Sequence, residues 1–187
     1  MNEFQIEYVK NKGELFKTLD NFDIIYNNQI QNYLPLYNIY FKLNETNFNN
    51  INLNTTWIIE TFENRISHNL FTCRLKNTLN QHVENKKVFI KYSPLIDPTK
   101  YITGKYDSVD KLFDLPSLNI ETNKKSDNLY NTAYVDSFFS YLSSKLYKTH
   151  DFFNGIDYYG SFLCNQKDYK VNICLLYTSD AADESCS

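Results

Sequence analysis

Two short stretches, Leu70-Phe71-Thr72-Cys73-Arg74-Leu75 and Lys87-Val88-Phe89-Ile90-Lys91-Tyr92, decide the fold class of this chain. Apolar and polar side chains alternate in both, which is typical of a strand that buries one face. The polar segment 76–86 separates them, so the sequence predicts an antiparallel hairpin with a long loop. Pro94 and Pro98 end the second strand, because proline cannot donate a hydrogen bond to a strand ladder.

The residues before the hairpin favour helices. Apolar side chains recur every three or four residues from Leu15 to Tyr37, which predicts a helix, and Pro35 limits that helix to about Tyr33. A short strand is expected at 37–43. A loop or linker is expected at 44–54, where six asparagines favour turns. The apolar spacing of 56–66 predicts one more short helix.

The residues after the hairpin predict a long irregular segment at 101–127 and then a helix at 133–148. One face of that helix is expected to be apolar, formed by Val135, Phe138, Phe139, Leu142 and Leu146, and the other polar, formed by Ser137, Ser140, Ser144 and Lys145. Strands are expected at 156–163 and 169–173. The order of helices, hairpin, long loop, amphipathic helix and further antiparallel strands predicts an α+β fold.

The last fourteen residues differ from the rest in composition. Residues 1–173 are rich in amino acids with AT-rich codons, and Ala133 is their only alanine. The segment Cys174–Glu184 has two adjacent alanines, and its codons can be written so that they match a transposon end and sequencing adaptor. We therefore expect 174–187 to be a non-native tail that has no part in the fold. A strand-like pattern runs directly into it, so the native chain is expected to be C-terminally truncated.

The sequence thus divides into three parts. Residues 1–54 are predicted to be a helical region with an Asn-rich linker, 55–173 an incomplete α+β domain, and 174–187 the adaptor-derived tail. The formal net charge is −3, and Asp180, Asp183 and Glu184 of the tail account for all of it. The neutral remainder offers no electrostatic attraction to nucleic acid or to an anionic membrane.

Two further patterns bear on the compartment. The sequence contains no run of about 18 apolar residues, so no membrane-spanning helix is expected. Residues 1–12 are polar and mixed in charge, so we do not expect a secretory signal there. Outside the tail the cysteines are Cys73 and Cys164, which are far apart in sequence and fit a reducing compartment.

One set of segments resembles a known family. Val88-Phe89-Ile90-Lys91, the helix 133–148 and Asp157-Tyr158-Tyr159-Gly160-Ser161-Phe162 follow one another in the order of the small lobe of a protein kinase. There, a V-A-I-K strand presents a lysine to the nucleotide phosphates and to an acid on the next helix. The resemblance covers about 66–173 and implies that Lys91 and Asp136 bind a nucleotide, with ATP and Mg²⁺ as cofactors. It implies no catalytic residue in this fragment, because the catalytic loop would follow Ile173.

The chain departs from that family at three places. No glycine lies between Gly13 and Gly104, so no Gly-rich loop precedes Lys91. Asp136 is the only acid of the helix and is one methylene shorter than the usual glutamate. Asp151-Phe152-Phe153-Asn154-Gly155 is not a D-F-G motif. Without the family, Lys91 is expected to be a solvated strand lysine and Asp136 an acid favoured by the helix dipole.

A second resemblance concerns the source of the chain. Four segments resemble an uncharacterised protein family of giant (nucleocytoplasmic large) DNA viruses: Ser93–Tyr101, Gly104–Tyr106, Ala133–Phe139 and Gly155–Phe162. This resemblance implies an AT-rich viral genome and a location in the host cytoplasm or in the virion. It implies no reaction.

The remaining candidate residues predict no metal site. Cys73 and Cys164 have no Cys or His neighbour at ligand spacing, and the spacing of Asp107, Asp110 and Asp114 fits no calcium loop. His68, His82 and His150 stand apart from any nucleophile motif. Two hypotheses follow. The first is a binding module, associated with virion or viral factory, whose aromatic surface contacts an unknown protein partner without catalysis. The alternative is the N-terminal part of a divergent kinase-like phosphotransferase.

Overall fold

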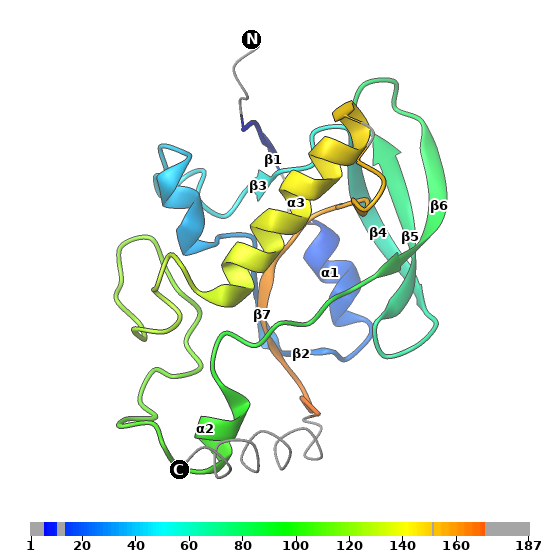
Figure 1. The fold of residues 1–187 in the computed structure, drawn as a ribbon. Helices are drawn as coiled ribbons and strands as arrows, with labels where there is room; N and C mark the ends of the chain where they lie inside the picture. The colour runs from blue at the N-terminus through cyan, green and yellow to red at the C-terminus, as the bar shows by residue number, and fades with distance from the viewer. Residues whose placement is uncertain (1–5, 11–13, 151, 171–187) are drawn as a thin grey trace, which may run out of the picture.

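The computed structural model describes residues 6–10, 14–150 and 152–170. The chain is a mixed α+β protein with antiparallel sheets, as predicted (Figure 1). Its elements in order are β1 (Val9–Lys10), α1 (Glu14–Asp20), β2 (Ile25–Gln31), the 3-10 helix η1 (Pro35–Ile39), β3 (Ile51–Asn52), β4 (Trp57–Arg65), β5 (Leu70–Asn77), β6 (Val83–Phe89), α2 (Pro98–Ile102), α3 (Thr132–His150) and β7 (Leu163–Gln166). The expected adaptor tail, 174–187, lies outside the described residues.

The predicted hairpin is confirmed as β5 and β6, which pair antiparallel with Leu70 opposite Phe89 and Phe71 opposite Val88. Its loop is shorter than predicted, because β5 continues to Asn77 and β6 begins at Val83. The Asn77 side chain accepts hydrogen bonds from the backbone N–H groups of Leu79 and Asn80 and closes the turn.

The predicted helix at 56–66 is wrong, because this segment is strand β4, the third member of the β4-β5-β6 sheet. Its β-branched and aromatic residues fit a half-buried strand. The register of β4 against β5 shifts between Ile59 and Thr61 and again between Phe62 and Asn64. These irregularities interrupt the two-residue alternation, so the sequence pattern resembles a helix.

The predicted helix at 15–33 is correct only in its first part. Helix α1 ends at Asp20, and Asp23 has a positive φ of 53°, which reverses the chain. The following residues form β2, which pairs antiparallel with β7. The strand expected at 37–43 is also wrong, because Pro35 occupies the first turn of η1, where its fixed φ favours a helix.

The last predicted strands are displaced. Residues 156–162 have no regular structure, and β7 begins at Leu163. Tyr169 and Lys170 are not in a strand, and 171–173 lie outside the described residues. The long segment from Ile90 to Asn131 is irregular except for α2, whose cap residue Asp97 accepts from the N–H groups of Thr99 and Lys100.

Two apolar clusters hold these elements together. The first joins η1, β3 and α3 and contains Leu34, Leu36, Tyr37, Ile51, Leu53, Tyr134, Phe138, Tyr141, Tyr158 and Leu163. The second lies between α1, β2 and the inner face of the β4-β5-β6 sheet and contains Leu19, Ile24, Ile25, Phe62, Phe71, Cys73, Leu75 and Val88. Each cluster combines residues from 6–54 with residues from later in the chain.

Candidate interaction surface

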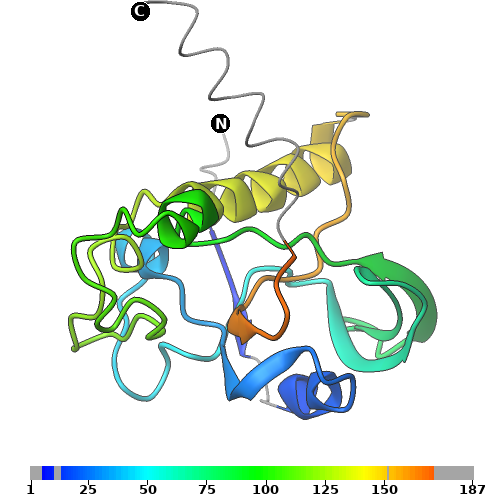
Figure 2. The same ribbon diagram turned by 90° about the horizontal axis from the view of Figure 1, so that it is seen from below.

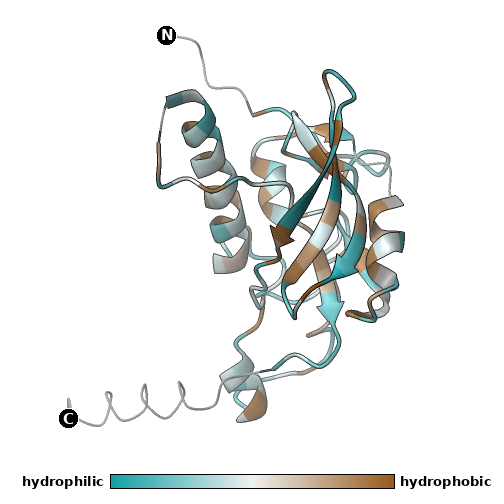
Figure 3. Ribbon diagram, turned by 90° about the vertical axis from the view of Figure 1, so that its right-hand side faces the viewer, coloured by the Kyte–Doolittle hydropathy of each residue, from teal (hydrophilic) through white to brown (hydrophobic). Residues whose placement is uncertain are grey.

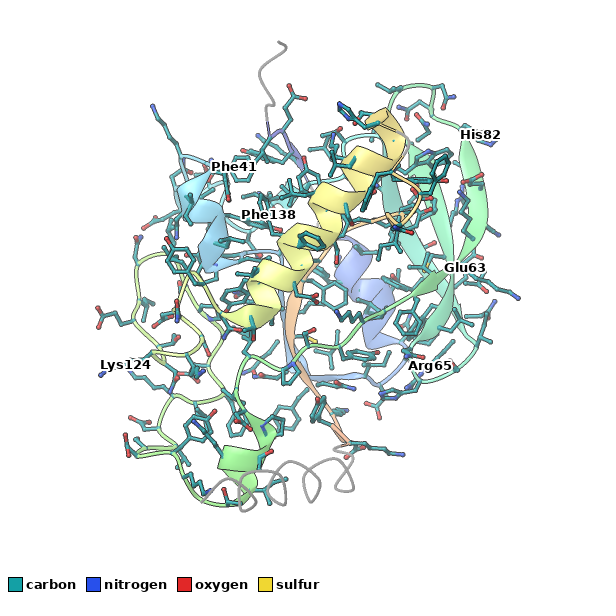
Figure 4. All side chains as sticks on the ribbon, in the orientation of Figure 1. Phe41, Glu63, Arg65, His82, Lys124 and Phe138 are labelled. Atoms are coloured by element: carbon teal, nitrogen blue, oxygen red, sulfur yellow. The ribbon has the colours of Figure 1, made fainter. Side chains whose placement is uncertain are left out.

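Helix α3 is fixed to the first cluster by one narrow face. Tyr134, Phe138 and Tyr141 are all buried, at the i, i+4 and i+7 spacing of one helix side. The Phe138 ring stacks on Tyr40 with 4.7 Å between centroids. Figure 4 shows Phe138 on the same side of α3 as Phe41, toward η1. Asn131 starts the helix, because its side-chain oxygen accepts from the N–H of Ala133 at 3.0 Å.

The predicted buried face of this helix is only partly correct. Phe138 is buried and Leu142 is half-buried, but Val135, Phe139 and Leu146 are 46%, 67% and 44% exposed. Ser144, predicted to face outward, is buried, and its hydroxyl accepts from the N–H of Tyr158 at 3.1 Å. The prediction omitted Tyr134 and Tyr141, which set the direction of the buried face.

Four apolar residues therefore form a second line along α3, here named the α3 stripe: Val135, Phe139, Leu142 and Leu146. Leu142 also packs against the first cluster, whereas the other three are exposed. Steps of four, three and four residues keep them on one side of the helix. In Figure 2, α3 runs along one edge of the molecule, and the sheets and α1 all lie on the same side of it. The stripe is thus a second apolar face on a helix whose first face is already buried.

A loop extends this surface at the C-terminal end of α3. The residues 152–157, here named the return loop, fold back so closely that a Cβ on Gly155 would lie 2.5 Å from the Ser143 carbonyl oxygen and 2.7 Å from the Tyr147 Cβ. Only glycine permits that approach. Phe153 is 86% exposed and Ile156 63%, and Phe152 and Tyr147 are exposed as well. The stripe and the return loop, with Tyr147, together expose eight apolar side chains, of which Leu142 is the most covered.

The charges around this surface are largely neutralised within the chain. Asp136 is 2.7 Å from Lys91, and Lys148 is 3.3 Å from Asp157. The Lys145 ammonium lies 5.8 Å from the centroid of the Tyr141 ring, within cation–π distance. The stripe is therefore apolar in its centre and close to neutral at its margins.

The two residues predicted to bind a nucleotide, Lys91 and Asp136, do meet, through the 2.7 Å ion pair. Lys91 follows the end of β6 instead of lying on a strand, and the two side chains are 63% and 42% exposed. The turn between β4 and β5 contains no glycine. Among the described residues, Lys91 and Asp136 therefore form an exposed ion pair, without a Gly-rich turn beside it to approach the phosphates of ATP with Mg²⁺.

Two open hollows lie elsewhere, with volumes of about 350 and 380 Å³. Both are lined by residues from two segments, 29–38 and 114–129, and neither includes Lys91 or Asp136. The side chains in their walls are mixed in character, among them Tyr33, Asp127, Ile120 and Thr122. The first hollow includes the carboxylates of Glu121 and Asp127, and Asp127 already accepts from the backbone N–H and the hydroxyl of Thr122.

The buried titratable groups of the core are protonated at neutral pH. Burial raises the pKa of Cys73 to about 12 and that of Cys164 to about 11, so neither thiol supplies a thiolate nucleophile. Burial also raises the pKa of Tyr37 and Tyr158. Ser161 joins their hydroxyls, at 3.2 Å from Tyr37 and 2.8 Å from Tyr158. These groups tie the core together and present no reactive atom at the surface.

Within the described ranges, no three His, Cys, Asp or Glu side chains are placed to hold a metal ion. Asp107, Asp110 and Asp114 lie in the irregular segment before α3. His68 is near the β4–β5 turn, His82 ends the β5–β6 turn and His150 ends α3. Of the helices that the structure describes, none combines the length and the apolar character of a membrane span.

Sequence reasoning identified the residues of the stripe but assigned them to the core. The signal that could have separated the two faces is the pair Tyr134 and Tyr141, seven residues apart, which follows the same period as Phe138. The resemblances to a kinase small lobe and to the giant-virus family stay predictions. Comparisons with protein-family models, with curated proteins and with solved structures found no match, so the role of this surface is inferred from its own residues.

Proposed function

We propose that this protein is a binding module, without catalysis of its own, whose α3 stripe and return loop contact an apolar surface of a protein partner. One observation carries the proposal: three apolar side chains along one line of α3 are exposed, with Phe139 at 67%, Val135 at 46% and Leu146 at 44%. A helix that is apolar on two sides is typically buried on both. Contiguous exposed apolar patches on a soluble domain mark interaction sites.

The chemistry of the surface favours a protein over other partners. Asp136 and Lys148 are each paired within the chain, so the margins offer little net charge for phosphates or anionic lipids. Exposed aromatic side chains such as Phe139, Tyr147 and Phe153 are the kind that anchor protein interfaces. The resemblance to the giant-virus family extends the proposal to a partner in the host cytoplasm or in the virion.

Site-specific photocrosslinking tests this proposal. Benzoylphenylalanine replaces Phe139 in one variant and Phe89 in the other, and adducts formed in infected cells are resolved by mass. Phe89 is 62% exposed at the end of β6, so it is a matched aromatic control. We expect a discrete protein adduct from position 139, none from position 89, and loss of the adduct when Leu146→Asp is added. Equal adducts from both positions, or none from 139, would contradict the proposal.

A kinase-like small lobe is the second candidate, and the ion pair between Lys91 and Asp136 is the observation that favours it. In that family a lysine on the third strand of the sheet pairs with an acid on the next helix, whereas Lys91 follows the end of β6. Titration of a fluorescent ATP analogue with Mg²⁺ tests this candidate directly. Saturable binding that both Lys91→Ala and Asp136→Asn weaken would support it, and no binding up to millimolar nucleotide would reject it.

A further inference from the structure

We infer that the partner seated on the α3 stripe is a second copy of this chain, with the two α3 helices antiparallel around a twofold axis. This inference rests on the proposed function and names its occupant. The spacing of the stripe is the first reason. The steps of four, three and four residues are the same in either direction along the helix. A twofold axis that passes midway between Phe139 and Leu142 therefore places every stripe residue of one copy opposite a stripe residue of the other.

That symmetry sets a specific register. Val135 of one copy lies opposite Leu146 of the other, and Phe139 lies opposite Leu142. Each level of the interface then combines a larger with a smaller apolar side chain, which is how facing helices interdigitate. The stripe is therefore complementary to a second stripe of the same sequence.

Charge is the second reason, because the charged side chains of α3 do not oppose the approach of a second copy. Asp136 is paired with Lys91 at 2.7 Å and Lys148 with Asp157 at 3.3 Å, both within the chain. The Lys145 ammonium lies 5.8 Å from the centroid of the Tyr141 ring, on the side of the helix that is already buried. The centre of the stripe is therefore free of charged side chains, as the core of a protein interface typically is.

The amount of apolar surface is the third reason. A stable interface removes about 800 Å² from each partner. The stripe alone is too small, because even a large aromatic side chain contributes only about 150–250 Å². Tyr147 and the return-loop residues Phe152, Phe153 and Ile156 add apolar surface at the C-terminal end of α3. In the antiparallel pair this end of each copy faces the N-terminal end of the other α3. The eight side chains together approach the area that a dimer requires.

Sedimentation equilibrium of the purified full chain tests whether the copies associate. We expect a monomer–dimer equilibrium, and we expect Phe139→Asp to weaken it by more than about thirtyfold, as for a central interface residue. Phe89→Asp makes the same chemical change at a similarly exposed position on the sheet and should leave the equilibrium unchanged. A chain that stays monomeric at all accessible concentrations would overturn the inference.

Cysteine crosslinking tests the register, in a background where Cys174 and Cys186 are serine. A mixture of Val135→Cys and Leu146→Cys, treated with a short bis-maleimide, should link one variant to the other. Neither variant alone should link to itself, because equal positions lie far apart in the antiparallel pair. Self-linking of each variant without cross-linking would show a parallel pair and would overturn the proposed arrangement.

The two tests separate this inference from the proposed function. The chain could be monomeric while position 139 still forms a discrete adduct with a different protein. That result would overturn the inference of a second copy but would support the proposed binding surface. A monomeric chain without any adduct overturns both. An adduct at twice the mass of the chain supports both.

Discussion

The β4-β5-β6 sheet and helix α3 each bury apolar side chains on an inner face, but their outer faces differ in character. On the sheet, the residues that alternate with Phe71 and Cys73 turn outward, and these include the Arg74–Glu60 ion pair at 3.0 Å and the exposed Lys87. Figure 3 shows the hydrophilic colour along most of β6. On α3 the outward line is Val135, Phe139 and Leu146. The outer face of the sheet is suited to contact with water, whereas the exposed line of α3 is suited to contact with another apolar surface.

The largest difference in stability is expected between alanine variants of a buried phenylalanine in the sheet and of the exposed phenylalanine on α3. Phe71 is fully buried, so Phe71→Ala should lower the free energy of unfolding by about 3–5 kcal/mol. Phe139→Ala should change it by less than about 0.5 kcal/mol. Urea unfolding followed by circular dichroism measures both, in dilute solution so that association does not contribute. Equal losses would mean that Phe139 belongs to the core.

Alkaline pH should destabilise the fold through the buried thiols. Burial raises the pKa of Cys73 to about 12 and of Cys164 to about 11, from 9.0. Above pH 9 the unfolded chain therefore loses protons that the folded chain keeps, and stability falls as pH rises toward these values. The slope is about 1.4 kcal/mol per pH unit for each thiol.

Urea unfolding midpoints measured between pH 8 and pH 11 test this decline in stability. Cys164→Ala removes one thiol and should make the decline shallower over the same range. Burial also raises the pKa of Tyr141 to about 12, which adds to the decline only above pH 10. A stability that does not change between pH 8 and pH 11 would be inconsistent with buried, protonated thiols.

A smaller effect should come from the contact that holds the return loop on α3. Gly155→Ala introduces a Cβ 2.5 Å from the Ser143 carbonyl oxygen, so the loop must move. We expect a loss of about 1–3 kcal/mol, as for other overpacked sites, measured by thermal unfolding. Gly104→Ala is the control, because nothing lies within 4 Å of its Cβ and only the strain of a φ of +65° remains. A larger loss at Gly104 would place the return loop away from α3.

The smallest effect is expected at the ion pair of Lys91 and Asp136. Both side chains are exposed, so Lys91→Ala or Asp136→Asn should change the free energy of unfolding by less than about 0.5 kcal/mol. The change in unfolding free energy of the double variant should equal the sum of the changes of the two single variants within error. A coupling well above this value in a double-mutant cycle would show that the pair is more than a surface contact.

The α+β class and the β5–β6 hairpin followed from the sequence, because a two-residue alternation over six residues is the period of a strand and not of a helix. Strand β4 did not, since its register shifts hide that alternation. Helix α1 was extended too far, because nothing local indicates that Asp23 adopts a positive φ or that β7, far along the chain, pairs with β2.

The residues of the candidate surface were predicted to be apolar, but their exposure was not predicted. Periodicity shows that a helix side is apolar, but it does not show whether the same chain or another one covers that side. The ion pair of Lys91 with Asp136 was anticipated from the kinase resemblance. The exposure of the pair agrees with the alternative expectation, in which Lys91 is a solvated lysine.

Two adjacent residues of α3 allow the most direct test of whether its second apolar face is an interface. Phe138 is 8% exposed and Phe139 67%, and the same substitution to aspartate can be made at each. Circular dichroism and sedimentation equilibrium of both variants decide the matter. We predict that Phe138→Asp loses the native fold, whereas Phe139→Asp keeps the native spectrum and unfolding midpoint but no longer associates. The interface would be contradicted if Phe139→Asp unfolded as Phe138→Asp does, or if it folded and still associated like the unaltered chain.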